Sequence, residues 1–127
     1  MSGVTDLEEL IHSLRPEPRD GEFVVVVSDG RDLDVQAVIR EDEGTTLVLR
    51  REDADAAGLA YDFVAAWITL TVHSDLAAVG LTAAVSTALA DAGISCNVLA
   101  GFHHDHLLVP ADRRDDALEV LGALTEQ

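Results

Sequence analysis

The sequence predicts an α+β fold of two small modules, in which helices pack on one face of antiparallel sheets. Two observations lead to this fold class. Apolar residues recur along the chain at spacings typical of helices in some segments and of strands in others. The 127 residues also divide into halves with similar element orders, α-β-β-β-α and then β-α-β-β-α. We place the two modules at residues 1–64 and 65–127, and modules of roughly 60 residues bury little surface alone.

The first half begins with a predicted amphipathic helix over residues 6–14, which Pro16 and Pro18 end. Thr5 and Glu8 have the spacing of a capping box at its start. Strands and the turns between them follow from valine-rich or alternating segments bounded by Gly and acidic residues. They comprise a strand at 22–28, a turn at 29–30, a strand at 35–39, a turn at 41–44 and a strand at 45–49. A short helix is expected over residues 52–59.

The second half begins with a predicted strand over residues 67–73, in which Trp67 and Thr69 share one face and Ile68 and Leu70 share the other. A helix over 81–92 ends at Gly93, where a glycine is favoured just after a helix. The remaining elements are strands at 94–100 and 104–109, and a last helix that Asp112 caps.

This order matches a split β-α-β unit, the ferredoxin-like arrangement, without its last strand. The first half lacks the first strand of the same arrangement. We therefore expect the two halves to share or exchange strands, with helices covering one face of the sheet. The other face or an edge then remains for contact with a second copy, so a homodimer is expected.

The composition is strongly acidic, with 24 Asp and Glu residues against 8 basic residues, all of them Arg, and a formal net charge of −16. Such a chain has no basic stripe for nucleic acid and no attraction to an anionic membrane. Two explanations stay open: adaptation to a salt-rich, halophilic habitat, where salt screens self-repulsion, or a high-GC codon bias that removes lysine.

A cytoplasmic, soluble protein is expected, because the N-terminus has no signal-peptide pattern and no apolar run approaches the ~20 residues of a membrane span. The single cysteine, Cys96, excludes an intrachain disulfide. Its place among apolar residues of a predicted strand favours a core position.

A histidine-rich segment at 103–106 invites a metal hypothesis. Strand alternation, however, places His104 and His106 on one face and His103 with Asp105 on the other, so neither face gathers three ligands. The spacing fits no common zinc pattern. No nucleophile elbow, phosphate-binding loop or dinucleotide fingerprint occurs. We therefore expect no metal, no cofactor and no catalysis.

Three segments of the second half, residues 74–89, 92–98 and 101–110, resemble the ACT-domain family. The chain is most similar to small stand-alone bacterial and archaeal proteins built from two ACT-like modules. In those proteins the first half carries an acidic Glu-Gly-Thr-Thr stretch, as residues 43–46 do here. The resemblance spans roughly residues 6–125. It implies two ACT-type modules that bind a small molecule, commonly an amino acid, and regulate an enzyme such as an aspartate kinase or act as a stand-alone sensor.

A candidate ligand site begins where Val79, Gly80, Leu81 and Thr82 open a predicted helix. The amide N–H groups of a helix start favour a carboxylate, and Gly80 lets a ligand approach the backbone closely. Asn97 offers both a donor and an acceptor. Asp105, with Glu43 from the other half, would supply carboxylates for an ammonium group. A carboxylate seat beside acidic side chains fits a zwitterion, so a free amino acid is the expected ligand.

Each of these residues also has a structural explanation. Gly80 would only form a tight turn, Asn97 would bond a neighbouring loop, Glu43 would lie in a solvated turn, and Asp105 would pair with a structural partner. The alternative function is therefore an interaction module that docks onto an enzyme without binding a ligand.

Overall fold

The computed structural model describes residues 7–29, 32–72 and 80–126. Its helices are α1 (Leu7–Ser13), α2 (Arg51–Ala56), α3 (Leu81–Asp91) and α4 (Arg114–Thr125), with a short 3-10 helix at Ala111–Arg113 before α4. Its strands are β1 (Arg15–Pro18), β2 (Phe23–Val27), β3 (Val35–Glu41), β4 (Gly44–Arg50), β5 (Val64–Thr71), β6 (Asn97–Ala100) and β7 (Asp105–Pro110).

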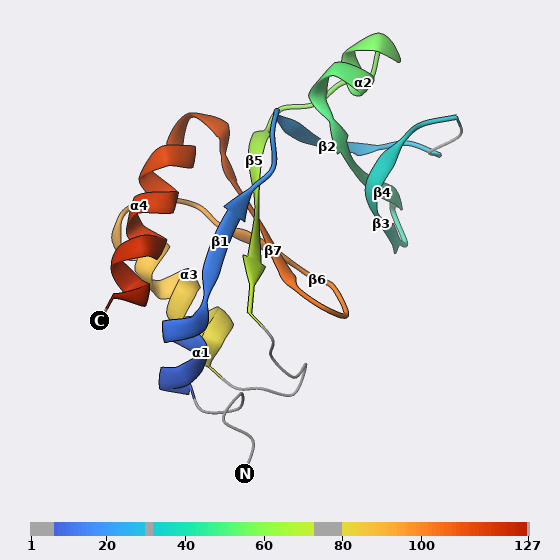
Figure 1. Ribbon diagram of the computed structural model, residues 1–127. Helices are drawn as coiled ribbons and strands as arrows, with labels where there is room; N and C mark the ends of the chain where they lie inside the picture. The colour runs from blue at the N-terminus through green and yellow to red at the C-terminus, as the bar shows by residue number, and fades with distance from the viewer. Residues whose placement is uncertain (1–6, 30–31, 73–79, 127) are drawn as a thin grey trace.

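All seven strands join one antiparallel sheet, whose main path runs β3-β4-β2-β5-β7-β6 (Figure 1). One edge of β5 pairs with β7 over residues 65–70. The other edge pairs with β1 at residues 68–71 and with β2 at residues 64–65. Strands β1 and β2 therefore follow each other along the same edge of β5, and β5 belongs to both halves of the sheet.

The halves complete each other by exchanging strands. In the second half, β1 lies beside β5 where the last strand of a ferredoxin-like unit would lie, giving the order β1-β5-β7-β6. In the first half, the start of β5 is the last strand beside β2. This confirms the expected fold class, two ferredoxin-like modules of an α+β protein, and the expected exchange.

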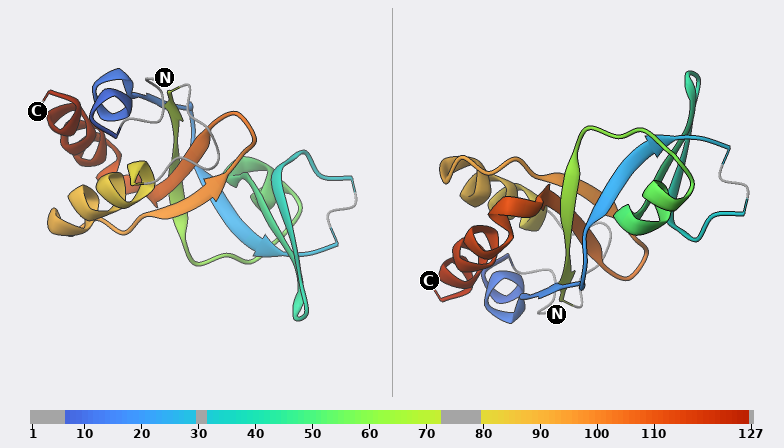
Figure 2. Two further views of the ribbon diagram at one scale, coloured as in Figure 1. Left: turned by 90° about the horizontal axis from the view of Figure 1, so that it is seen from below. Right: turned by 90° about the horizontal axis from the view of Figure 1, so that it is seen from above.

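The expectation that the first half lacks its first strand is wrong, because β2 is that strand. What this half lacks, within its described residues, is a helix between β2 and β3. The helix predicted over 6–14 does not belong there either: α1 packs against α3 and α4 of the second half (Figures 1 and 2).

The sheet has two unlike faces. On one face, α1, α3 and α4 cover β5 and β7, and the core contains residues such as Leu14, Ile68 and Leu121. On the same face of the first half, Ala54 of α2 packs on β2 and β4. No helix among the described residues covers the opposite face, whose buried residues are Phe23, Val48, Ala65, Trp67 and Leu108. We call this second surface the helix-free face.

Several local predictions hold and others need correction. Gly93 follows α3 with φ of +74°, and the N–H of Ile94 donates to the carbonyl of Leu89 at 2.9 Å, as expected of a glycine-ended helix. Asp112 does not cap α4, because it lies inside the 3-10 helix and Arg113 is the residue before α4. The helix expected at 52–59 ends at Ala56, and the strand expected at 94–100 begins at Asn97. The capping box at Thr5 lies outside the described residues.

Strand β1 was missed because it contains Pro16 and Pro18. Proline cannot donate to a strand ladder and is tolerated where one side of the strand has no strand partner. Strand β1 pairs with β5 alone, so its prolines are compatible with the sheet.

We expect Val24→Ala to lower the free energy of unfolding by about 2 kcal/mol, because Val24 is fully buried at the junction of β2 with β5. The matched control is Val27→Ala on the same strand, where the side chain is 71% exposed and the expected change is within about 0.5 kcal/mol. Urea titrations followed by Trp67 fluorescence and by far-UV circular dichroism measure both effects. The two probes should report one coincident transition, since β5 links the halves. Two separate transitions would contradict the shared-strand fold.

Candidate functional site

Gly80 directly precedes α3 with φ of +101°, a backbone conformation that favours glycine. A Cβ atom at this position would lie 3.1 Å from Cδ2 of Leu7, so Gly80 also lets α1 approach closely. Gly80, the residue before α3, has no side chain, and within residues 7–29, 32–72 and 80–126 no side-chain cap is found at this helix start. The amide N–H groups of its first turn have no partners within the helix.

Thr82 and Asp105 come together beside this helix start. The hydroxyl of Thr82 in α3 donates to Oδ2 of Asp105 in a long contact of 3.4 Å. Asp105 begins β7 opposite Ala100 and Leu70, on the face that α3 covers. A carboxylate thus lies next to the partially positive end of a helix, which together offer opposite charges to a small ligand. Val79 lies outside the described residues.

Asn97 and Glu43 lie elsewhere. Asn97 pairs with Leu108, which places it on the helix-free face and at the other end of β6 from the pairing of Ala100 with Asp105. Glu43 is exposed in the turn between β3 and β4, and this hairpin lies far from α3 in both views of Figure 2. Of the predicted site residues that the structure describes, one copy of the chain therefore groups Gly80, Leu81, Thr82 and Asp105 and leaves out Asn97 and Glu43.

The histidine segment divides between a turn and a strand. Gly101 donates its N–H to the carbonyl of His104 at 2.9 Å, so His103 and His104 lie in the turn before β7, where both are exposed. Asp105 and His106 then alternate between the two faces of β7, as the sequence predicted. No group of three metal-ligating side chains occurs among the described residues.

Cys96 lies just before β6 and packs, half-buried, against the helix-covered core. Burial raises the pKa of its thiol. This agrees with the predicted core position and with an unreactive thiol.

A group of aromatic and basic residues on the helix-free face was not anticipated. The rings of Phe23 and Trp67 lie 5.4 Å apart. Arg19 Cζ lies 4.2 Å from the Trp67 ring centre, and Arg50 Cζ lies 5.1 Å from the Phe23 ring centre. His106 contacts the other side of this group, with its ring 5.2 Å from that of Trp67. The sequence placed Trp67 on one face of its strand, but only the register of β2, β5 and β7 brings its neighbours to it.

The contacts of His106 favour its neutral form. The N–H of Trp67 Nε1, which can only donate, is shared between Thr69 Oγ1 at 3.2 Å and Nδ1 of His106 at 3.3 Å, a geometry that suits an unprotonated Nδ1. Thr69 Oγ1 lies 3.0 Å from the same nitrogen. Burial, followed by the charges of Arg19 and His104, lowers the pKa of His106, and Asp105 opposes this shift.

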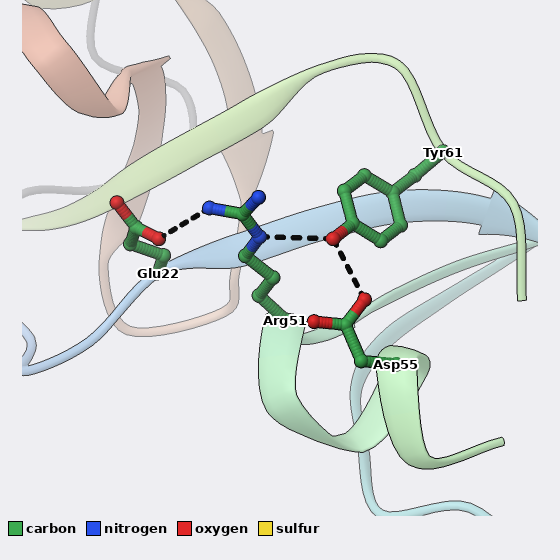
Figure 3. A network of polar contacts seen from close by, with 4 residues as sticks. All are labelled: Glu22, Arg51, Asp55 and Tyr61. Carbon is green, nitrogen blue, oxygen red and sulfur yellow. Dashed lines mark hydrogen bonds and ion pairs between the residues drawn. The ribbon is translucent and has the colours of Figure 1, made fainter. Parts of the chain in front are cut away.

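A second polar group fixes α2 to the start of β2 (Figure 3). Arg51 donates through Nε to the Tyr61 hydroxyl and through Nη1 to Oε1 of Glu22, both at 2.9 Å. Tyr61 in turn donates to Asp55 at 2.7 Å. The hydrogen bonds to Tyr61 and then Glu22 raise the pKa of Arg51. A surface pocket of about 300 Å³ lies here, lined by Gly21, Glu22, Arg50, Arg51, Glu52 and Asp55.

Comparison with known protein families identifies both halves. One ACT-domain model matches residues 2–66, and a different ACT-domain model matches residues 63–123. The chain belongs to the ACT-domain family. ACT domains serve as regulatory ligand-binding modules, so the tandem arrangement supports a regulatory role in general.

Solved structures of similar fold include a stand-alone protein and regulatory parts of aspartate kinases. A protein of unknown function from Vibrio cholerae is 45% identical over 98% of this chain and 99% of that one, with a TM-score of 0.86. The regulatory subunit of aspartate kinase from Thermus thermophilus has a TM-score of 0.63 at 11% identity, covering 87% of this chain and 95% of that chain. E. coli aspartokinase III, solved with aspartate and ADP, has a TM-score of 0.61 at 13% identity, covering 90% of this chain and 33% of that enzyme.

No curated protein matches this chain.

The helices in the part of the chain that the structure describes are too short or too polar to cross a membrane.

We expect the His106 imidazole to titrate below the ordinary histidine value of 6.5, because burial and Arg19 disfavour its charged form. Protonation therefore favours unfolding: the contribution of neutral His106 is complete above about pH 6.5 and is lost as the pH falls. NMR titration of the ring protons measures this directly, with the urea-unfolded chain as reference. Arg19→Gln should raise the His106 pKa, whereas Arg40→Gln on β3 should leave it unchanged. A folded-state pKa at or above the unfolded value would refute the neutral assignment.

Proposed function

We propose that this ACT protein is a non-catalytic regulator that binds a free amino acid at the start of α3. The observation that carries the proposal is the contact of Thr82 with Asp105 beside the start of α3, which Gly80 precedes without a capping side chain. Support also comes from the family, since ACT domains are regulatory, and from the structural similarity to the regulatory subunit of aspartate kinase.

The two charged groups of a free amino acid match the two charged features of this site, the helix start and the Asp105 carboxylate. The first-turn amides of α3, including those of Leu81 and Thr82, would bind the α-carboxylate, because N–H groups and the helix dipole favour an anion there. The Asp105 carboxylate would bind the α-ammonium group through a charge-assisted hydrogen bond. Gly80 leaves the approach to the backbone free of a side chain.

Asn97 and Glu43 would reach this ligand only from a second copy of the chain. A homodimer is therefore part of the proposal. The outer edge of β6, which carries Asn97, has no strand partner within the part of the chain that the structure describes. A regulated enzyme in the cytoplasm is the proposed target of the dimer.

Docking onto an enzyme without a ligand is the second candidate function. Two large apolar side chains favour it: Phe102, in the turn between β6 and β7, is 78% exposed, and Val27 is 71% exposed. A ligand screen in which no amino acid binds, together with the isolation of one stable enzyme partner, would support docking over sensing.

We expect one of the twenty amino acids to raise the melting temperature of the wild-type protein. A ligand at about 100 times its Kd adds about 2.7 kcal/mol, which corresponds to several degrees for a chain of this size. The screen is a thermal-shift assay in molar KCl, where salt screens the repulsion among the 24 acidic residues.

Asp105→Asn should abolish that shift, because the neutral amide no longer attracts an ammonium group. The matched control is Asp112→Asn, which removes the same charge from an exposed position outside the site and should keep the full shift. The proposal fails if no amino acid at millimolar concentration shifts the wild type, or if both variants lose the shift equally.

A further inference from the structure

We propose that the helix-free face carries a separate site for a small oxyanion, whose carboxylate or phosphate group binds between Arg19 and Arg50. The two arginines come from segments that the sheet brings together. Arg50 ends β4 directly opposite Phe23. Arg19 follows β1, and its backbone N–H donates to the carbonyl of Trp67 at 2.9 Å. The proposal does not depend on the amino-acid site, which lies on the other face.

Both guanidinium groups are held in place by aromatic rings. Arg19 lies over Trp67 and Arg50 over Phe23, and the two rings pack against each other at 5.4 Å. Trp67 and Phe23 are themselves buried, so neither ring shifts freely. Stacked arginines lose little further freedom when they bind an anion, and their planar donors fit the oxygens of carboxylate and phosphate.

Neither arginine has an anionic partner in the part of the chain that the structure describes. The ion pairs found there join Arg51 to Glu22 and Arg113 to Asp116. Arg19 donates to the Gln36 side-chain oxygen at 2.8 Å, and Arg50 donates to the Asp20 carbonyl at 3.0 Å. Because each guanidinium has five N–H donors, most of their donors remain available.

The two positive charges also act on each other. Partial burial lowers the pKa of Arg19, and the charge of Arg50 lowers it further. The two like charges repel each other, whereas an anion bound between them attracts both. In a chain of net charge −16, two arginines over neighbouring rings, with no ion pair among the residues that the structure describes, form a local exception to the acidic composition.

Nearby carboxylates limit where the anion binds. The pocket beside Arg50 also contains the carboxylates of Glu22, Glu52 and Asp55, which outnumber Arg50 and Arg51 and repel an anion. The sheet surface between Arg50 and Arg19 is therefore favoured. Glu17 lies opposite Thr69 on this face and is exposed, so its charge weakens the site without blocking it.

Trp67 is the natural probe, because it is the only tryptophan of the chain and lies under Arg19. Fluorescence is titrated with sodium phosphate and, separately, with sodium succinate, at constant ionic strength maintained with chloride and at a pH where His106 is neutral. We expect a saturable change with a millimolar Kd for at least one anion. The anion with the lower Kd tells whether the site prefers phosphate or carboxylate.

The variants separate a specific site from a general charge effect. Arg50→Gln and Arg19→Gln should each raise the Kd at least about tenfold, as expected for loss of a charged hydrogen-bonding partner. Arg40→Gln removes the same charge from an exposed position on β3. It should change the Kd less than about twofold, because exposed surface charges interact only weakly. Glu17→Gln should lower the Kd. If Arg50→Gln does not fold, Arg50→Lys takes its place in the test. Lysine keeps the charge but not the planar donors, so this variant should also weaken anion binding.

Three results would overturn the proposal. One is the absence of a saturable signal in wild type with both anions. The second is equal weakening by Arg50→Gln and Arg40→Gln. The third concerns the oligomeric state, measured by sedimentation: the wild type is a dimer, Arg19→Gln converts it to a monomer, and neither anion changes the wild-type dimer. In that case the arginines bind a carboxylate of a second copy of the chain. The amino-acid thermal shift is measured independently, so failure of one site leaves the other testable.

Discussion

The pairing of β5 with three other strands is the constraint on which the rest of the structure depends. Its last residues pair with β1, its first residues with β2, and nearly its whole length with β7. Each half therefore uses a strand that the other half provides or shares. This arrangement lets two modules of roughly 60 residues bury continuous cores that neither would bury alone. It also explains why α1, at the start of the chain, packs in the second half.

The two faces of β5 and β7 separate the two proposed sites. Asp105 faces α3 and Thr82, whereas the next residue, His106, faces Trp67 and Thr69. The alternation of a strand thus places the Asp105 carboxylate and the His106 imidazole on opposite sides of the same sheet. Strand β7, which pairs with β5 on one side and β6 on the other, therefore contributes a residue to each face.

Local patterns predicted the elements and their faces, but not their partners. The periodicity of residues 81–92 with Gly93 gave α3 almost to the residue, and the alternation around Trp67 and Ile68 gave the two faces of β5. Strand β1 was missed because its prolines argue against a strand unless its neighbours are known. Asn97 was grouped with Asp105 because its amide offers both a donor and an acceptor, whereas the register of β6 with β7 places the two residues on opposite faces. Register and strand exchange depend on contacts between residues far apart in the chain, which a single sequence does not encode locally.

The positions of Arg19 and Arg50 show how an anion site is compatible with the acidic composition. Most of the surface repels anions at long range, and this repulsion weakens as salt shortens the Debye length from about 10 Å at 0.1 M to about 3 Å at 1 M. Arg19 and Arg50 act at hydrogen-bond range from partly buried positions, where screening is weaker. Added salt therefore weakens the long-range repulsion between the acidic surface and an anion more than it weakens the short-range attraction of the two arginines for that anion. An acidic protein can in this way favour an oxyanion at one point of its surface, because the sheet places two stacked arginines where no carboxylate of the described chain pairs with them.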